Sequence, residues 1–345
     1  MQRVAVIGLG PIGAACARVV LAESDMKLVA LYDVDPAKHG MSADDFTDGQ
    51  AEVAGDPLDI EQKKVPNVSA TLEAALSADP DVAIVTASSR FDELAPMFHI
   101  LLDHRVSIVS SCEQLAWPWY AHRELADRLD LAARDAGCVV LGTGANPGFV
   151  MDALPVMLAT VVRRVARVRC TRRVDASVRR SALQKKIGAT MAVNEFRDLA
   201  DRGEVGHVGL VESVAMLAAG LGCHVAAGSV EQVIEPVLAE EPTPSAMGLI
   251  RPGEVGGIHQ IARWQDDRLA IELDLTMAVG IRDAKDRIEI DGPVPLTLRI
   301  PGATPGDSGT IAALLNQTRQ IDRIAPGLKT MIDVPPAGSR QRSPC

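Results

Sequence analysis

The chain has 345 residues, a formal net charge of -10 and a hydrophobic fraction of 47%. This length predicts two domains with a sizeable buried core, and the acidic balance excludes the basic footprint of a nucleic-acid-binding protein. Its six cysteines are Cys16, Cys112, Cys138, Cys170, Cys223 and Cys345, and no two of them form a C-x-x-C pair. We therefore expect reduced thiols, no metal site and a cytoplasmic protein without a membrane span or signal peptide.

The first stretch of the chain is the most informative. Residues 4–13 read VAVIGLGPIG, an apolar run that opens into Gly8, Gly10 and Gly13 with Pro11 and Ile12 between the last two glycines. The run suits a buried strand, and the glycines allow a tight turn and a close backbone approach to a pyrophosphate. A second strand, residues 28–32, ends at Asp33, where an acid can hold the ribose hydroxyls. The pattern predicts dinucleotide binding, and the alternative is a glycine-rich structural turn.

The pattern of predicted strands and helices changes once along the chain. Up to about residue 145, short apolar runs alternate with helical patterns, as in a doubly wound parallel sheet. From about residue 150, strand patterns follow one another without crossover helices, which predicts a mixed, mostly antiparallel sheet. The expected α/β organisation is a Rossmann domain over residues 1–148, an α+β substrate and dimerisation domain over 149–303, a helical segment over 304–334 that packs back on the first domain, and a flexible tail over 335–345. We expect the second sheet to leave an apolar face that forms a homodimer.

Ligands of an open parallel sheet bind beyond the carboxyl ends of its strands, so the residues that follow each apolar run are the ones to inspect. Ala87 and Ser88 follow the strand predicted at residues 81–86 and are candidate cofactor contacts. Glu113 follows the strand at 106–110 and precedes Trp117. A partly desolvated carboxylate beside tryptophan suits proton transfer, whereas the alternatives are a helix N-cap or a surface ion pair.

Three other features carry weaker signals. Asn146 lies in a loop after the strand at 138–142, where it could bind a nicotinamide carboxamide or simply belong to a domain-crossing turn. His207 lies between Gly206 and Gly209, although a lone histidine is more often structural. A basic cluster suits an anionic group or a solvated face; its members are Arg172, Arg173, Arg179, Arg180, Lys185 and Lys186.

Together these segments resemble a known family, the NAD(P)-dependent amine dehydrogenases related to 2,4-diaminopentanoate dehydrogenase, within the dihydrodipicolinate-reductase-like group. The resemblance covers nearly the whole chain. It rests on GLGPIG (8–13), SCEQL (111–115), GTGANPGFVMD (142–152), QKKIG (184–188), GHVGLVES (206–213), GGIHQ (256–260), GDSGT (306–310) and PGLKTM (326–331). Dihydrodipicolinate reductase itself fits less well, because its paired histidines and K-x-D-A-P-S-G-T motif are absent.

The resemblance implies an oxidoreductase that acts on CH-NH2 donors and interconverts a primary amine with a ketone or aldehyde plus ammonia. It implies that Glu113 is the catalytic acid/base, that Trp117, Phe149 and Met151 line the apolar pocket, and that His207 and Asn146 position polar groups. We expect NAD to be preferred over NADP, because Asp33 repels a 2′-phosphate, and Lys38 to soften this preference. The alternatives are a diamine or amino-acid dehydrogenase, a reductase of the dihydrodipicolinate type and a non-enzymatic NAD(H) sensor.

Overall fold

The computed structural model describes residues 1–45 and 65–339, and the chain divides into two compact units. Unit 1 comprises residues 1–149 and 305–345, and unit 2 comprises residues 150–304. Cys345 and the last part of the expected tail, residues 340–345, lie outside the described residues.

Unit 1 is built on a seven-stranded sheet in which every pairing is parallel. The strand order is β15-β6-β5-β4-β1-β2-β3, so the chain starts near the middle and winds outward in both directions. This confirms the predicted doubly wound sheet. The strands are β1 (Gln2–Ile7), β2 (Met26–Tyr32), β3 (Val68–Ser69), β4 (Val82–Val85), β5 (Ser107–Ser110), β6 (Val139–Gly142) and β15 (Gly327–Lys329).

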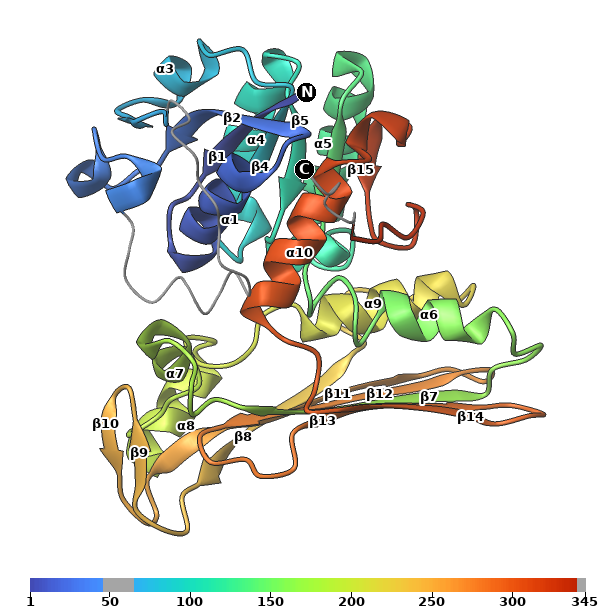
Figure 1. Cartoon of the computed structure of the whole chain (residues 1–345). Helices are drawn as coiled ribbons and strands as arrows, with labels where there is room; N and C mark the ends of the chain where they lie inside the picture. The colour runs from blue at the N-terminus through green and yellow to red at the C-terminus, as the bar shows by residue number, and fades with distance from the viewer. Residues whose placement is uncertain (46–64, 340–345) are drawn as a thin grey trace. The chain divides into compact units, whose positions relative to one another are not determined.

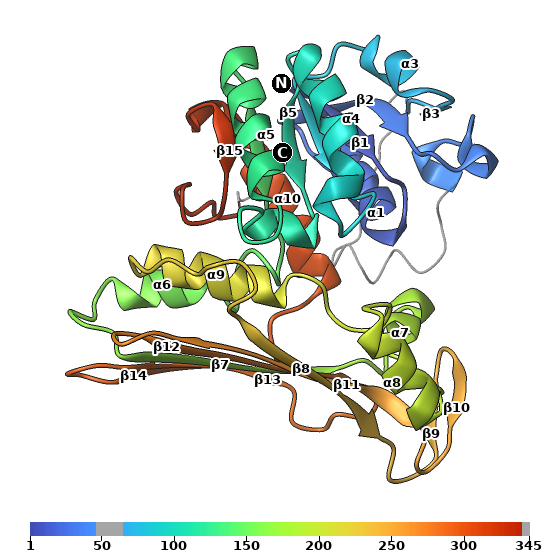
Figure 2. The same cartoon turned by 180° about the vertical axis from the view of Figure 1, so that it is seen from behind.

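Helices cover both faces of this sheet because its central strand is apolar on both sides (Figure 1). Val4 and Val6 point into one core, which they share with α1 and α10, whereas Ala5 and Ile7 point into a second core with α4 and α5. Helices α4 and α5 are seen in Figure 2, which views the molecule from behind. The helices of unit 1 are α1 (Pro11–Ala22), α3 (Leu72–Leu76), α4 (Phe91–Asp103), α5 (Arg123–Ala136) and α10 (Asp307–Thr318).

The last part of unit 1 differs from the helical segment expected for residues 304–334. Helix α10 ends at Thr318, and after a short 3-10 turn the chain forms β15, which pairs in parallel with β6 at the edge of the sheet. The strand has only three residues, too few for a periodic pattern. The Leu328 N-H donates to the Asp130 carboxylate on α5 at 2.8 Å, which fixes this outermost strand.

Unit 2 contains a six-stranded sheet of order β14-β13-β7-β12-β11-β8. Only β7 and β12 pair in parallel, and the other four pairings are antiparallel, as the sequence predicts. A separate hairpin is formed by β9 (Thr243–Ser245) and β10 (Gly248–Ile250). The sheet strands are β7 (Arg167–Asp175), β8 (Glu231–Leu238), β11 (Val255–Gln265), β12 (Ala270–Ala278), β13 (Lys285–Asp291) and β14 (Leu296–Pro301).

One face of the unit 2 sheet is covered by α6 (Ala153–Ala159) and α9 (Leu210–Gly220), as Figures 1 and 2 show. Two further helices, α7 (Ser181–Lys186) and α8 (Val193–Asp201), lie towards the end of the sheet that carries the β9–β10 hairpin (Figure 1). The strand residues that face α6 and α9 alternate with outward-facing ones, and most of them are buried and apolar, as Ile258 and Leu273 are.

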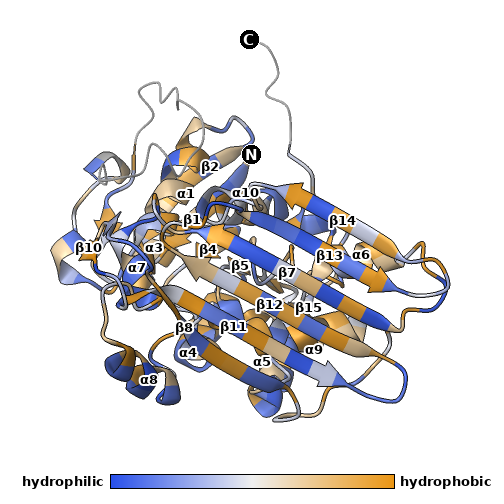
Figure 3. Ribbon diagram, turned by 90° about the horizontal axis from the view of Figure 1, so that it is seen from below, coloured by the Kyte–Doolittle hydropathy of each residue, from blue (hydrophilic) through white to orange (hydrophobic). Residues whose placement is uncertain are grey.

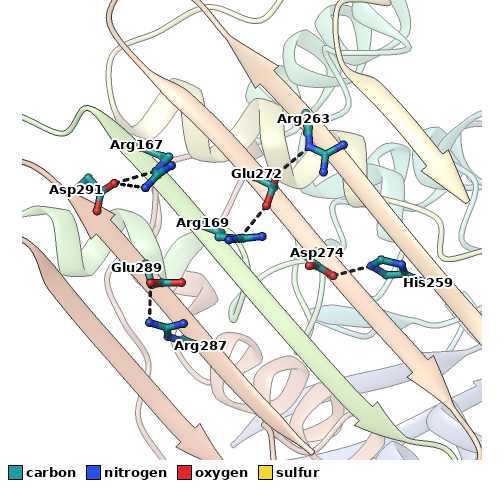
Figure 4. A network of polar contacts seen from close by, with 9 residues as sticks. All are labelled: Arg167, Arg169, His259, Arg263, Glu272, Asp274, Arg287, Glu289 and Asp291. Carbon is teal, nitrogen blue, oxygen red and sulfur yellow. Dashed lines mark hydrogen bonds and ion pairs between the residues drawn. The ribbon is translucent and has the colours of Figure 1, made fainter.

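The opposite face of this sheet is not apolar, so that expectation is wrong. Hydrophilic and hydrophobic residues alternate along its strands (Figure 3), and the outward positions carry a network of ion pairs (Figure 4). Glu272 is held by two arginines at 2.7 and 2.8 Å. The ion pairs are Arg167–Asp291, Arg169–Glu272, Arg263–Glu272 and Arg287–Glu289, and the His259 imidazole is hydrogen-bonded to the Asp274 carboxylate at 3.0 Å. Arg287 and Glu289 lie on the same strand, β13, whereas the other arginine pairs join neighbouring strands and stabilise the register of the sheet, each by about 0.2–1 kcal/mol.

Candidate active site

Five strand ends of unit 1 lie level with one another. Ile7 pairs with Tyr32 of β2 and with Val85 of β4, Val85 pairs with Ser110 of β5, and Ser110 pairs with Gly142 of β6. Because all five strands are parallel, the loops that follow these residues leave the sheet at its carboxyl edge. Each loop carries one of the groups predicted from the sequence, so the sheet collects them along a single edge.

The glycine turn after β1 is closed by contacts that leave no room for side chains. Gly8 has a φ of +84°, and a Cβ there would lie 2.6 Å from the backbone of Ala87. A Cβ on Gly13 would lie 1.9 Å from the Gly8 carbonyl oxygen, which also accepts a hydrogen bond from the Thr86 hydroxyl at 2.7 Å. These two glycines bring the first turn of α1 directly against the end of the strand.

The middle glycine has a different environment. A Cβ on Gly10 would meet nothing within 4 Å, and Gly10 is the N-cap of α1, with Pro11 at the first helical position and Ile12 packed against the core. The N-terminus of this 12-residue helix therefore faces open space that a side chain would fill. Free backbone N-H groups at such a terminus fit the pyrophosphate of a dinucleotide.

Asp33 is buried at the end of β2 and holds the glycine turn. Its Oδ2 accepts from the Leu9 N-H at 2.6 Å and from the Lys38 ammonium at 2.8 Å, and its Oδ1 accepts from the Asp35 N-H at 2.9 Å. Burial acts to raise the pKa of Asp33, but the hydrogen bonds from Lys38, Asp35 and Leu9 outweigh it and lower that pKa. The carboxylate is therefore ionised at neutral pH.

Ala87 and Ser88 follow β4 beside the glycine turn. The backbone of Ala87 is what excludes a side chain at Gly8. Ser88 lies just before α4, where its hydroxyl donates to the Glu93 carboxylate at 2.5 Å and accepts from the Arg90 N-H at 3.1 Å. The structure thus brings both predicted cofactor contacts to the same edge, and the Ser88 hydroxyl also stabilises the start of α4.

Glu113 is the first residue of a 3-10 turn, η3 (Glu113–Ala116), three residues beyond β5. The N-cap of this turn is Cys112, so the alternative reading of Glu113 as a helix N-cap is wrong. On the far side, the Gln114 N-H donates to the Ser89 carbonyl at 3.2 Å, and the Gln114 side chain accepts from the Phe91 N-H at 2.9 Å. The backbone around the half-buried Glu113 is therefore tied to the neighbouring β4–α4 loop.

Trp117 ends η3 and packs against Trp119, with ring centroids 5.3 Å apart and the rings inclined by 59°. The Trp119 indole N-H donates to the Asp127 carboxylate at 3.0 Å. Trp119, hydrogen-bonded to α5, thus packs against the half-buried Trp117. The predicted pocket residue Phe149 is the last residue of the first part of unit 1 and is 38% exposed.

The loop after β6 is folded tightly around Asn146. The Ala145 N-H donates to the Thr310 hydroxyl of α10 at 3.2 Å, although these residues are 165 positions apart. Gly148 has a φ of +116°, and a Cβ there would lie 2.5 Å from the Gly144 nitrogen. Asn146 is therefore held at the carboxyl edge of the sheet by contacts on both sides of it.

The remaining two predicted pocket residues belong to unit 2. Met151 is 1% exposed, whereas His207 is half-buried just before α9, in a turn where Gly206 and Gly209 have φ values of +126° and +92°. Asp152 caps α6 and accepts from the Ser213 hydroxyl at 2.7 Å.

The basic cluster is partly used inside unit 2. The Arg172 guanidinium, 4% exposed, lies 2.6 and 2.7 Å from the two carboxylate oxygens of Asp286, and it also donates to the Thr304 carbonyl. Burial lowers the pKa of Arg172, and Asp286 counteracts this effect. Arg173 pairs with Asp283 at 3.0 Å. The anion that binds Arg172 is thus a carboxylate of the protein itself.

Within residues 1–45 and 65–339, no three or more His, Cys, Asp or Glu side chains come together as ligands for a metal ion. No helix in the same part of the chain has the length and hydropathy needed to cross a membrane.

Comparison with known proteins identifies the family. Residues 149–341 match the family model described as the 2,4-diaminopentanoate dehydrogenase C-terminal domain. The chain belongs to the 2,4-diaminopentanoate dehydrogenase family. A curated member, 2,4-diaminopentanoate dehydrogenase from Acetoanaerobium sticklandii, is 28% identical over 340 residues, which cover 96% of this chain and 93% of that protein. Family membership confirms the resemblance in the sequence and makes the chain an NAD(P)-dependent oxidoreductase acting on CH-NH2 donors.

Solved structures show the same fold. An amine dehydrogenase from Mycobacterium smegmatis superposes with a TM-score of 0.83 at 22% identity and covers 98% of this chain and 97% of its own. A probable dehydrogenase from Thermotoga maritima gives a TM-score of 0.57 at 13% identity, over 96% of this chain and 92% of its own. The Rossmann architecture and the sheet-rich second unit are therefore shared with structurally characterised dehydrogenases.

Sequence reasoning missed three residues that hold the site together. Thr86 could have been found, because it ends the apolar run of β4 directly before the candidate loop. Gln114 and Thr310 lie in two motifs of the resemblance, SCEQL and GDSGT, but their roles could not be predicted, because each contacts a backbone N-H of a distant segment. Their partners are known only once the chain is folded.

The glycine turn generates a matched pair of variants. Gly13→Ala forces a Cβ against the Gly8 carbonyl oxygen and should destabilise the protein by about 1–3 kcal/mol, the usual cost of overpacking. Gly10→Ala adds a Cβ in open space, so its stability should stay within about 0.5 kcal/mol of wild type while its dinucleotide affinity falls. Urea unfolding and cofactor titration of both variants check this. Equal stability of the two variants would contradict the tight contact.

Proposed function

We propose that this chain oxidatively deaminates a primary amine to a ketone or aldehyde, or runs the reverse reductive amination, with Glu113 as the acid/base and NAD as the preferred cofactor. The proposal rests on one observation. Glu113 follows β5, Ala87 follows the neighbouring strand β4, and the glycine turn follows β1, the next strand along. The ends of these three strands pair directly through Ile7, Val85 and Ser110. A carboxylate at this place lies in the row of loops that serves a dinucleotide.

The residues present fit a nicotinamide dinucleotide. The open N-terminus of α1 at Gly10 suits the pyrophosphate, Asp33 suits the adenosine ribose, and Ala87, Ser88 and Asn146 line the edge further along. When bound, the nicotinamide supplies the hydride acceptor or donor.

Glu113 has two tasks in this scheme. For oxidation, the carboxylate takes a proton from the substrate ammonium group, so that the nitrogen lone pair can form the C=N bond as the hydride leaves. Glu113 releases this proton to solvent, and the regenerated carboxylate stabilises the positive iminium. It then takes a proton from the water that attacks the iminium carbon and passes it to the nitrogen, which leaves as ammonia and takes up the hydroxyl proton. In sum, the ammonium form of the amine, NAD+ and water give the carbonyl compound, NH4+, NADH and one proton. Trp117, Phe149 and Met151 are proposed to keep the reacting carbon in apolar surroundings, with His207 and Asn146 as polar positioning groups.

The possible substrates are amines with or without a carboxylate group. The relative from Acetoanaerobium sticklandii is named for a diamine that carries a carboxylate, and an enzyme for such a substrate needs a cation for that group. Arg172 does not offer one, because it is bound to Asp286. This favours an amine without a carboxylate. A diamine or amino acid remains the second candidate, through Arg179 and Arg180.

The functional form is proposed to be a homodimer formed through unit 2. The support is the face of its sheet opposite α6 and α9, where the charge pairs of Figure 4 present alternating signs that a second copy can complement by symmetry.

Cofactor preference follows from Asp33. We expect a higher kcat/KM with NAD than with NADP, because the ionised carboxylate repels a 2′-phosphate, and Val34 next to it is 77% exposed and offers no cation. Lys38→Ala should widen the difference, because it removes the ammonium that neutralises Asp33 at 2.8 Å. Initial rates with each cofactor at a fixed amine concentration check both points. Equal or greater efficiency with NADP would refute the preference.

Glu113→Gln should lower amine turnover by roughly two orders of magnitude or more, since the amide keeps the shape of the side chain but cannot take up a proton. Affinity for NAD should stay near that of wild type. Glu124→Gln, an exposed position in the first turn of α5, is the matched control and should not change the rate. Steady-state rates and cofactor titration separate the hypotheses: near-normal turnover of the Glu113 variant would refute the acid/base role of Glu113, whereas NAD binding without amine turnover in wild type would leave the dinucleotide-sensor alternative standing.

The oligomer can be tested separately. Light scattering at micromolar concentration should give the mass of at least a dimer, and Arg169→Glu should shift it towards the monomer, because this change places a second negative charge beside Glu272. Leu131→Glu, on the exposed side of α5 in unit 1, is the control and should leave the mass unchanged. A wild-type monomer would contradict the dimer.

A further inference from the structure

A fully buried glutamine grips the backbone of the predicted pocket residue His207. Gln260 lies on β11 and is 0% exposed. Its side-chain oxygen accepts from the His207 N-H at 2.8 Å, and its side-chain nitrogen donates to the His207 carbonyl at 2.9 Å. The carboxamide thus pairs with both polar backbone groups of one residue, as a neighbouring strand would.

Gln260 is a polar residue at a position of β11 where an apolar residue is usual. Its neighbours on the same face of β11, Ile258 and Ala262, are apolar and fully buried, which is the usual choice for strand residues under a helix. A glutamine there must satisfy its polar atoms or destabilise the fold. Its second amide hydrogen is directed to the Gln232 side chain at 3.2 Å, so the side chain donates both hydrogens.

The turn that carries His207 fits around this side chain. Gly206 has a φ of +126°, and a Cβ there would lie 3.4 Å from the Gln260 oxygen and 3.0 Å from a methyl group of Ile234. On the other side, Gly209 has a φ of +92° and caps α9. Glycines on both sides allow the turn many conformations, and the grip of Gln260 selects one of them.

We propose that Gln260 is a positioning residue for the amine substrate, which acts by fixing the backbone of His207 and thereby the place of its side chain. The inference rests on the proposed function, in which His207 contacts the substrate. It also explains why two of the motifs that carry the family resemblance, GHVGLVES and GGIHQ, occur together: they form the two halves of one contact.

The alternative is a purely structural grip that only secures the start of α9. Both readings predict a loss of stability when Gln260 is replaced, because two buried backbone groups lose their partners. Only positioning predicts that the kinetic loss depends on the side chain of His207. A double-mutant cycle between the two residues therefore separates the readings.

The experiment compares wild type with Gln260→Leu, His207→Ala and the double variant, using an amine that the wild type oxidises. Gln260→Leu should lower kcat/KM for the amine roughly 10- to 100-fold, as expected for a misplaced contact, and leave the KM for NAD within about twofold. In the His207→Ala background the same change should alter kcat/KM by less than about twofold, although it lowers Tm in both backgrounds. Equal kinetic losses in the two backgrounds, or a lowered Tm with unchanged kinetics, would overturn the proposal.

Two further variants keep the test decisive. Gln317→Leu replaces another buried glutamine, on α10 of unit 1, and controls for stability: it should lower Tm without changing the amine KM. If Gln260→Leu does not fold, Gln260→Glu preserves the shape, and its protonated form offers a carbonyl acceptor and a hydroxyl donor like those of the amide. The kcat/KM of Gln260→Glu relative to wild type should then rise as the pH falls, and a ratio independent of pH would count against positioning.

A failure of the proposed function is recognisable by itself. If wild type oxidises no amine, that function fails, and the contact is then tested by hydrogen exchange of the His207 amide. This amide should exchange slowly in wild type and at least about tenfold faster in Gln260→Leu, because an amide released from a buried partner opens more readily. Unchanged exchange would show that Gln260 does not fix the turn.

Discussion

The contact between Gly13 and the carbonyl oxygen of Gly8 is the constraint on which the dinucleotide site depends. A side chain at either position would overlap backbone atoms, so the first turn of α1 can lie against the end of β1 only because both residues are glycine. Thr86 adds a hydrogen bond to the same oxygen and ties the turn to β4. The helix N-terminus is then presented in open space at Gly10, where an anion gains from the helix dipole and the free N-H groups.

The parallel register carries this placement across the sheet. Because β1, β4 and β5 are aligned residue for residue, the loops that follow them lie at one edge of the sheet. The pairing of Val85 with Ser110 therefore places Glu113, which follows β5, at this edge. Two hydrogen bonds then fix the backbone next to Glu113. The side-chain oxygen of Gln114 accepts from the Phe91 N-H, and the Gln114 N-H donates to the Ser89 carbonyl. This backbone frame would reduce the reorganisation needed in the proton transfer that we propose for Glu113.

Three glutamine side chains take the place of peptide groups as hydrogen-bond partners of the backbone. Gln114 accepts a backbone N-H in unit 1, and Gln260 pairs with both backbone groups of His207 in unit 2. Gln184, fully buried in α7, donates to the Ala176 carbonyl and accepts from the Ala246 N-H, which joins a loop to the β9–β10 hairpin. Each glutamine satisfies backbone groups that irregular segments would otherwise leave without partners, so the loops near the ends of the sheets are ordered without regular secondary structure.

The amino-acid sequence determined the features that depend on local pattern. The apolar run with three glycines and Asp33 is short-range information, and so is the alternation of strands and helices up to residue 145, because strand and helix periods are written in neighbouring residues. The succession of strands after residue 150 likewise predicted a mixed, mostly antiparallel sheet. Tertiary structure alone decided what depends on distant partners: β15 as the seventh strand, the pairing of Arg172 with Asp286 and the grip of Gln260 on His207. It also decided that the outer face of the second sheet is charged, since the strand pattern shows which residues alternate but not which set faces the helices.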